Sequence, residues 1–160
     1  MKYSFLASVA LTAAALSLSA CGSEPAETTE AAPDGMPGVE VSNARLILPA
    51  VTGNPGVLYF DLAYTGDKAA ALRGVDVAGA ESATMHQYVD LSGEKAMYEL
   101  LPQPLQKGQT LKFEPGANHI MLDGLADTVT AGSTVEATLI FAGGDKFSFP
   151  AEVRGAGEER

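Results

Sequence analysis

Apolar residues recur at every second position through much of the chain between residues 39 and 154, and this period constrains the fold more than any other feature. The clearest runs are Leu58, Phe60, Leu62 and Tyr64, then Val135, Ala137, Leu139 and Phe141, then Phe147 and Phe149. Successive side chains of a β-strand point to opposite faces, so these runs predict strands with one buried face. No amphipathic segment of three helical turns is apparent. The chain is therefore expected to be all-β.

Turn-forming residues divide the apolar runs at short intervals. They lie at Pro49–Pro55, Thr65–Asp67, Ser92-Gly93, Lys107-Gly108, Glu114–Gly116 and Gly143–Asp145. Short strands with such regular punctuation are typical of an antiparallel sandwich or barrel, and the length suits one domain. We predict a single Greek-key β-sandwich over residues 39–155, followed by a short C-terminal tail over residues 156–160.

The first twenty residues predict an export signal. Lys2 supplies a positive start, and the apolar run Phe5–Leu18 is shorter than the roughly 18 to 20 residues that cross a bilayer. The run ends in Leu18-Ser19-Ala20-Cys21, which resembles the bacterial lipobox. We therefore expect residues 1–20 to be a lipoprotein signal peptide and Cys21 to be lipidated. The alternative is an unrelated cysteine beside an ordinary cleavage site.

Cys21 is the single cysteine of the chain, so an intramolecular disulfide is excluded and acylation would leave no free thiol. Residues 21–38 contain almost nothing bulky and apolar, which predicts a flexible tether. Together these features predict a periplasmic protein whose lipid anchor alone joins it to the cell-envelope membrane. Gly22 stands where Asp would favour the inner membrane, so the outer membrane is weakly favoured.

The net charge of −10 argues against a nucleic-acid partner, because phosphates would be repelled. An acidic surface suits a cation or a basic protein patch, although solubility is its commoner meaning. No hydrophobic stripe indicates a stable dimer, so a monomer is expected.

The chain has two histidines and five methionines, and four of these seven residues fall into one pattern. Ten, twenty-one and one residues lie between its successive members. They are His86, Met97, His119 and Met121. Thioether sulfur is a soft donor and imidazole a borderline one, so this set favours Cu(I) over hard cations. Free thiols tend to be oxidised outside the cytoplasm, whereas methionine can bind copper without forming disulfides. The chemistry alone therefore favours a copper site.

Strand alternation makes the geometry of such a site plausible. His119 and Met121 would share one face of a strand while Ile120 and Leu122 face the core. Because a copper carrier must release its ion, we expect the ligands at a shallow, solvent-reachable patch.

The segments 84–88 and 96–100 flank a turn and predict a hairpin, with Tyr98 and Leu100 inward and Met97 outward. A two-residue loop at Leu91-Ser92 would place His86 directly opposite Met97, whereas a register slip would make them diagonal. Met85 should point to the other side of the strand, so it is not included among the four predicted ligands and is at most a substitute for one of them.

The spacing His86-x10-Met97-x21-His119-x-Met121 resembles the signature of the PCu(A)C family of periplasmic copper chaperones. The stretches Ala83–His86 and Glu114–Leu125 resemble the corresponding parts of that family. The resemblance implies a cupredoxin-like β-sandwich that is not an enzyme. It also implies one Cu(I), passed to the copper-site subunit of cytochrome c oxidase, chiefly to its Cu(A) centre. Another periplasmic copper chaperone would be a further partner. Some relatives add a second, Cu(II)-type site on a His- and Met-rich tail, which residues 156–160 lack.

Other functions compete with that of a copper chaperone. A blue-copper electron carrier needs a cysteine thiolate between two histidines, and Cys21 precedes the domain. Copper sequestration would use the same ligands and stays open, as does a non-catalytic envelope lipoprotein with an interaction role. An enzyme has little support, because both histidines belong to the predicted site and no G-x-S-x-G elbow or phosphate loop is present.

Overall fold

The structure is a computed structural model that describes residues 35–158. The predicted signal peptide, Cys21 and most of the predicted tether lie outside the described residues. The described part contains ten strands and no helix, so it offers no helix long and apolar enough to span a membrane. The strands are β1 (Val39–Ile47), β2 (Gly56–Tyr64), β3 (Ala70–Val77), β4 (Ser82–Leu91), β5 (Glu94–Glu99), β6 (Gln103–Leu105), β7 (Gln109–Phe113), β8 (His119–Asp123), β9 (Thr134–Phe141) and β10 (Lys146–Arg154).

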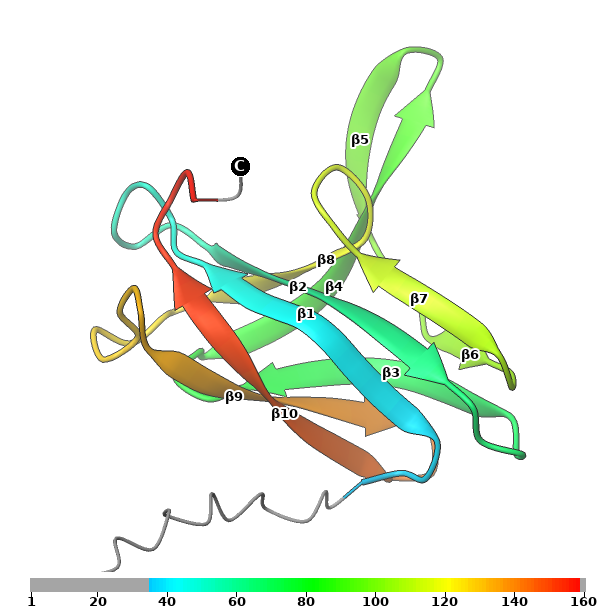
Figure 1. Ribbon diagram of the computed structural model, residues 1–160. Coiled ribbons are helices and arrows are strands. Elements are labelled where there is room, and N and C mark those ends of the chain that lie inside the picture. Colours follow the sequence, from blue (N-terminus) through cyan, green and yellow to red (C-terminus); the bar gives the residue numbers. More distant parts are fainter. Residues whose placement is uncertain (1–34, 159–160) are drawn as a thin grey trace, which may run out of the picture. The chain divides into compact units, whose positions relative to one another are not determined.

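The strands form one hydrogen-bonded sheet that curls over itself into a sandwich (Figure 1). Their order is β5-β4-β8-β2-β1-β10-β9-β3-β6, and β7 pairs with the second half of β2. The ladder between β1 and β10 is parallel, whereas the other ladders are antiparallel. The prediction of an all-β sandwich is confirmed.

The core follows the period of two that the sequence shows. In β2, the residues Leu58, Phe60 and Leu62 are fully buried and alternate with half-buried neighbours. The ring of Phe60 stacks on Phe113 of β7 at a centroid distance of 4.5 Å and lies 5.4 Å from Phe149 of β10. Burying each such side chain contributes about 1.5–3 kcal/mol, so these contacts fix the layers on which the functional face is built.

The loop between β4 and β5 differs from the one that would pair His86 with Met97. The two loop residues are Ser92 and Gly93, at φ 61° and 92°, and the Gly93 amide donates to the Asp90 carboxylate over 2.7 Å. A tight hairpin turn of this kind needs positive φ at both central positions, which glycine meets without strain. The resulting register places Met97 opposite Tyr88, so the diagonal arrangement of His86 and Met97 is the one found.

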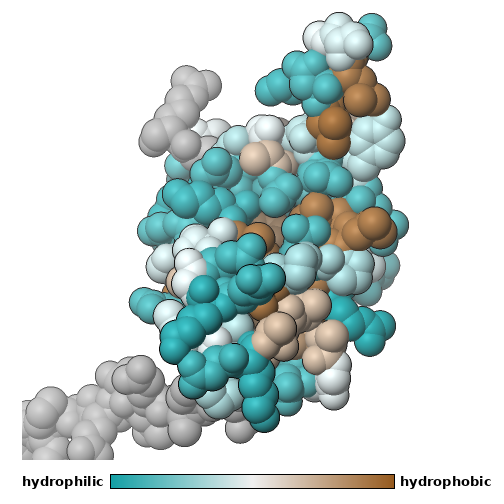
Figure 2. Space-filling view, turned by 90° about the vertical axis from the view of Figure 1, so that its right-hand side faces the viewer, coloured by the Kyte–Doolittle hydropathy of each residue, from teal (hydrophilic) through white to brown (hydrophobic). Residues whose placement is uncertain are grey.

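The outer half of the β4–β5 hairpin projects from the sandwich, and Figure 2 shows apolar surface on it. The prediction that Tyr98 faces inward is wrong, because no sandwich layer lies beneath this part of β5 and Tyr98 is 47% exposed. Leu100, at the base of the hairpin, is buried as predicted. Exposed large apolar side chains gather here: Tyr88, Leu91, Met97, Tyr98 and Leu101.

Candidate metal centre

The two histidines lie side by side on adjacent strands. His86 of β4 is directly opposite His119 of β8, and the ring centroids are 5.9 Å apart with the planes inclined at 57°. Residues that pair directly across antiparallel strands point to the same face of the sheet. The backbone register alone therefore brings together two imidazoles that are 33 positions apart in the sequence.

Both methionines are diagonal neighbours of His86 on that same face. Met97 is two residues from Glu99, the direct partner of His86 on β5, and Met121 pairs with Thr84, two residues before His86 on β4. Diagonal neighbours have Cα atoms roughly 7–8 Å apart, which a long side chain can bridge. His86 is thus the centre of the group, and the two methionines flank it from opposite sides.

His119 is held in one orientation by the loop that precedes it. Its Nδ1 lies 3.0 Å from the carbonyl oxygen of Ala117, and its side chain is almost fully buried. A carbonyl oxygen can only accept a hydrogen bond, so Nδ1 is the donor, and the lone pair of the neutral ring is then on Nε2. Metal-binding histidines are commonly oriented in this way by a backbone carbonyl.

The loop between β7 and β8 is itself tightly built. The Glu114 amide donates to the Asn118 carbonyl over 2.8 Å, and the Ala117 amide donates to the Glu114 carbonyl over 3.1 Å. Gly116 lies between them at φ 79°, in the left-handed region that favours glycine. These contacts aim the Ala117 carbonyl at the imidazole of His119.

His86 has an unpaired polar atom. Its Nδ1 is buried and has no hydrogen-bond partner among residues 35–158. A buried nitrogen without a partner costs free energy, which coordination to a metal ion would recover. The donor set of this face, with two imidazoles and two thioethers, therefore fits a soft or borderline cation.

The two methionines differ in exposure. The side chain of Met97 is 42% exposed on the projecting hairpin, whereas Met121 is partly covered within the sheet. Met85 is 5% exposed and belongs to the core on the opposite face. In the described part of the chain, no three His, Cys, Asp or Glu side chains lie close enough to hold a metal. A metal on this face would need the methionine sulfurs as well as the imidazoles.

Tyr88 completes the face and was missed by the sequence analysis. Its ring stacks on that of His119 with centroids 5.0 Å apart and planes 26° apart, and it pairs across the strands with Met97. The stacking explains why His119 is buried although it points away from the core. The available signal was alternation, since Tyr88 follows His86 by two positions and must share its face.

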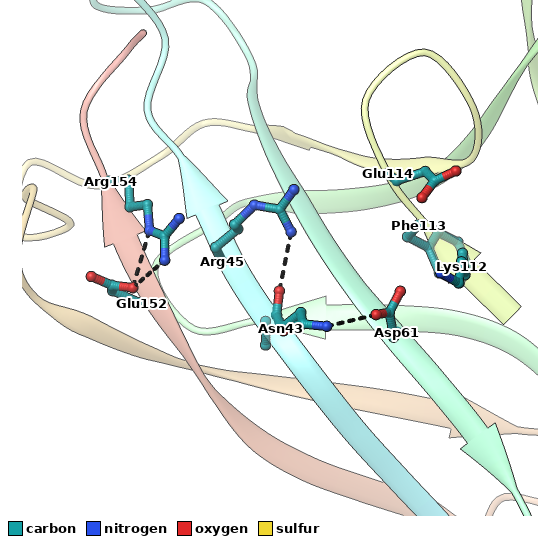
Figure 3. Close-up of a pocket in the computed structure, with 9 residues that line it drawn as sticks. Asn43, Arg45, Asp61, Lys112, Phe113, Glu114, Glu152 and Arg154 are labelled. Carbon is teal, nitrogen blue, oxygen red and sulfur yellow. Dashed lines mark hydrogen bonds and ion pairs between the residues drawn. The ribbon is translucent and has the colours of Figure 1, made fainter. Parts of the chain in front are cut away.

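A separate hollow of about 590 Å³ lies elsewhere on the sheet, over β1, β2, β7 and β10, and none of the four predicted ligands lines it (Figure 3). Its charged residues are Arg45, Asp61, Lys112, Glu114, Glu152 and Arg154. They are largely satisfied within the chain: Asn43 donates to Asp61 over 2.7 Å, and Arg154 contacts Glu152 at 2.7 Å. No histidine, cysteine or methionine lines this hollow, so it offers no soft donor to a metal.

Comparison with known proteins identifies relatives at the level of sequence. The family described as "Putative lipoprotein LpqE-like" matches residues 39–153. The "Putative lipoprotein Lxx21020" of Leifsonia xyli subsp. xyli is 32% identical over 108 residues, which is 67% of this chain. The match spans 64% of the length of that relative.

Solved structures share the fold. The copper-bound PCuAC domain from PmoF2 has a TM-score of 0.61 at 18% identity, over 78% of this chain and 98% of that domain. Cu(I)-bound DR1885 from Deinococcus radiodurans has a TM-score of 0.57 at 23% identity, over 79% of this chain and 84% of its own. The predicted likeness to PCu(A)C proteins is thereby confirmed for the fold, which is cupredoxin-like.

Proposed function

The chain belongs to the LpqE-like family of lipoproteins, and from this premise we propose that it is a copper carrier of the cell envelope. It binds one Cu(I) through His86, Met97, His119 and Met121 and passes the ion to a partner protein. The fold that it shares with copper-bound PCuAC domains supports the proposal.

The observation that carries the proposal is the pairing of His86 with His119. One imidazole has its Nδ1 hydrogen bonded to Ala117, which leaves Nε2 free, and the other has a buried Nδ1 without a partner in the described residues. Both methionines lie within diagonal reach of His86. Two nitrogens and two neutral sulfurs suit Cu(I), which prefers soft ligands and does not require charged ones.

The arrangement favours transfer over permanent retention. Met97 stands on a projecting hairpin with 42% of its side chain exposed, so it can leave the ion without disturbing the core. A recipient's ligand can then approach from the solvent. Copper sequestration is the alternative use of the same ligands.

The first test is an anaerobic titration with Cu(I) against a colorimetric chelator. The chain without residues 1–21 should bind one equivalent tightly, and the double variant His119→Ala, Met121→Ala should lose that binding. Met85→Leu is the matched control, because it removes a neighbouring thioether from the core side of β4 and should bind as the wild type does. Absence of tight binding in the wild type would refute the copper carrier.

The finer proposal concerns the recipient, the copper-site subunit of cytochrome c oxidase with its Cu(A) centre. A strain that lacks this chain should show reduced oxidase activity that returns with the wild-type gene and not with the double variant. Normal oxidase activity together with greater sensitivity to copper would favour sequestration instead.

Anchoring through Cys21 to the envelope membrane, with the outer membrane weakly favoured, is part of the same proposal and agrees with the lipoprotein description of the family. Cys21→Ser should release the protein from the membrane fraction. Membrane association that survives this change would argue against the lipid anchor.

A further inference from the structure

The strand β5 has one free edge. It is the first strand in the sheet order, and within residues 35–158 only β4 pairs with it. The Leu100 amide donates to the Met85 carbonyl over 2.8 Å, in continuation of the β4–β5 register. Hydrogen-bonded positions alternate along an antiparallel strand. The backbone groups of residues 94, 96 and 98 therefore face β4, and those of Lys95, Met97 and Glu99 face outward.

This edge lacks several of the usual protections against pairing. Natural edge strands are commonly short, twisted, covered by a loop, interrupted by proline or lined with charged side chains, of which β5 has Glu94, Lys95 and Glu99. Here, the six residues of β5 contain no proline and stand on a hairpin that projects from the body (Figure 2). Exposed apolar side chains from both faces of the hairpin surround the edge, and clustering of this kind marks interaction surfaces.

We propose that two copies of this chain associate through β5, paired antiparallel about a two-fold axis at Met97. The three residues whose backbone groups face outward then meet their counterparts: Met97 lies opposite the partner's Met97, and Lys95 lies opposite the partner's Glu99. The symmetry repeats the second pair, so the contact contains two Lys–Glu pairs with opposite charges facing each other.

The second face of the strand is self-complementary in size. In the same register, Ala96 lies opposite the partner's Tyr98, again twice, so each large ring meets a small side chain. Both faces of the sequence Glu94-Lys95-Ala96-Met97-Tyr98-Glu99 therefore support one pairing.

Neighbouring registers lose this match. One β5 strand can slide along the other only in steps of two residues, because the hydrogen-bond and side-chain patterns both repeat every second residue. Any other step would place backbone groups that face β4 at the contact. One such shift pairs Lys95 with the partner's Met97, and the other pairs Met97 with the partner's Glu99. Either leaves charged side chains opposite apolar ones.

The association should be weak, because two short strands bury far less than the roughly 1,200–2,000 Å² of stable complexes. We therefore expect reversible association that becomes appreciable only at high protein concentration. The sequence predicts a monomer because it shows no hydrophobic stripe, and a free strand edge leaves no such signal. The pairing uses no copper, so it goes beyond the proposed function and does not depend on it.

Sedimentation equilibrium of the full chain tests the proposal, in density-matched detergent with a metal chelator present. The wild type should associate reversibly with protein concentration. Lys95→Glu and Glu99→Lys should each weaken the association by about tenfold, because each sets two like-charged pairs face to face. Lys146→Glu is the matched control, since it makes the same charge change at the exposed start of β10 and should leave the association unchanged.

The decisive measurement mixes the two single variants. The Lys95→Glu copy has glutamate at both positions, and the Glu99→Lys copy has lysine at both. In a mixed pair every glutamate therefore faces a lysine, so the 1:1 mixture should associate as strongly as the wild type. The double variant Lys95→Glu, Glu99→Lys should also associate. A chain that stays monomeric up to about 1 mM, or a mixture no stronger than its components, would overturn the proposal.

Discussion

The two sides of the histidine and methionine face are built differently. On β8, His119 is 4% exposed, hydrogen bonded to Ala117 and covered by the ring of Tyr88. On β5, Met97 is 42% exposed and has no layer of the sandwich beneath it. The buried side is suited to fixing the direction from which a metal is bound, and the exposed side to changing its contacts. In the proposed copper site, binding and release would thus depend on two different strands, β8 and β5, which flank β4 on opposite sides.

The largest expected contrast is in stability. Ile120→Ala empties a fully buried position of β8 and should lower the free energy of unfolding by about 2–5 kcal/mol. Tyr98→Ala on β5 should cost less than about 1 kcal/mol, because the ring is half exposed. Urea titration of both copper-free variants measures the difference. Equal losses would mean that the hairpin is part of the cooperative core, and the comparison would fail.

His119→Ala should produce the largest single loss of Cu(I) affinity, about hundredfold or more. The change removes the one imidazole whose free nitrogen is fixed in direction, and changes to the partners that orient such ligands already cost about 10–100-fold. Competition with a Cu(I) chelator measures the loss. His119→Gln with unchanged affinity would show that the imidazole is not a ligand.

Met97→Leu should lower Cu(I) affinity by only about tenfold while raising the rate of copper release. Leucine keeps the apolar volume without the sulfur, and the side chain is exposed enough for the free energy of unfolding to stay within about 0.5 kcal/mol of the wild type. Stopped-flow transfer to a chelator gives the rate. A loss as large as that of His119→Ala would remove the proposed division between the two strands.

The smallest effect is expected at Gly116. A methyl group there meets no atom within 4 Å, but the residue sits at φ 79°, so Gly116→Ala should cost about 1 kcal/mol through backbone strain alone. The same strain should tilt the Ala117 carbonyl away from His119 Nδ1, and the loss of this contact should weaken Cu(I) binding a few-fold. Gly116→Asn is the matched control, because asparagine adopts positive φ more readily than alanine. It should lose less stability and less Cu(I) affinity than Gly116→Ala.

The sequence predicted the sandwich because apolar alternation and turn residues are local signals. The runs in β2 and β9 are buried at every second position, and the six predicted turn clusters fall between strands. The same alternation placed His119 and Met121 on a face opposite Ile120, as the structure has them. Their role as ligands remains a proposal.

The register of the β4–β5 hairpin and the burial of individual side chains were harder to predict. Positive φ at Ser92 moved the hairpin loop by one residue from the alternative that would pair His86 with Met97. The burial of His119 depends on Tyr88 and Ala117, which reach it from a neighbouring strand and a loop. Tyr98 fits an inward position by alternation, but alternation carries no information on whether a second layer is present. Such contacts depend on tertiary structure, which the local pattern does not encode.

The parallel ladder between β1 and β10 has a consequence for how the chain acquires its fold. The final strand stands between the first strand and β9, so the path of backbone hydrogen bonds from one end of the sheet to the other runs through it. A chain made from its N-terminal end cannot close this path until its last residues are available. The native contacts are then far apart in sequence, and high contact order slows folding to milliseconds or longer. An incomplete chain lacks the ladder that joins the two parts of the sheet, although hairpins such as β4–β5 can form without it.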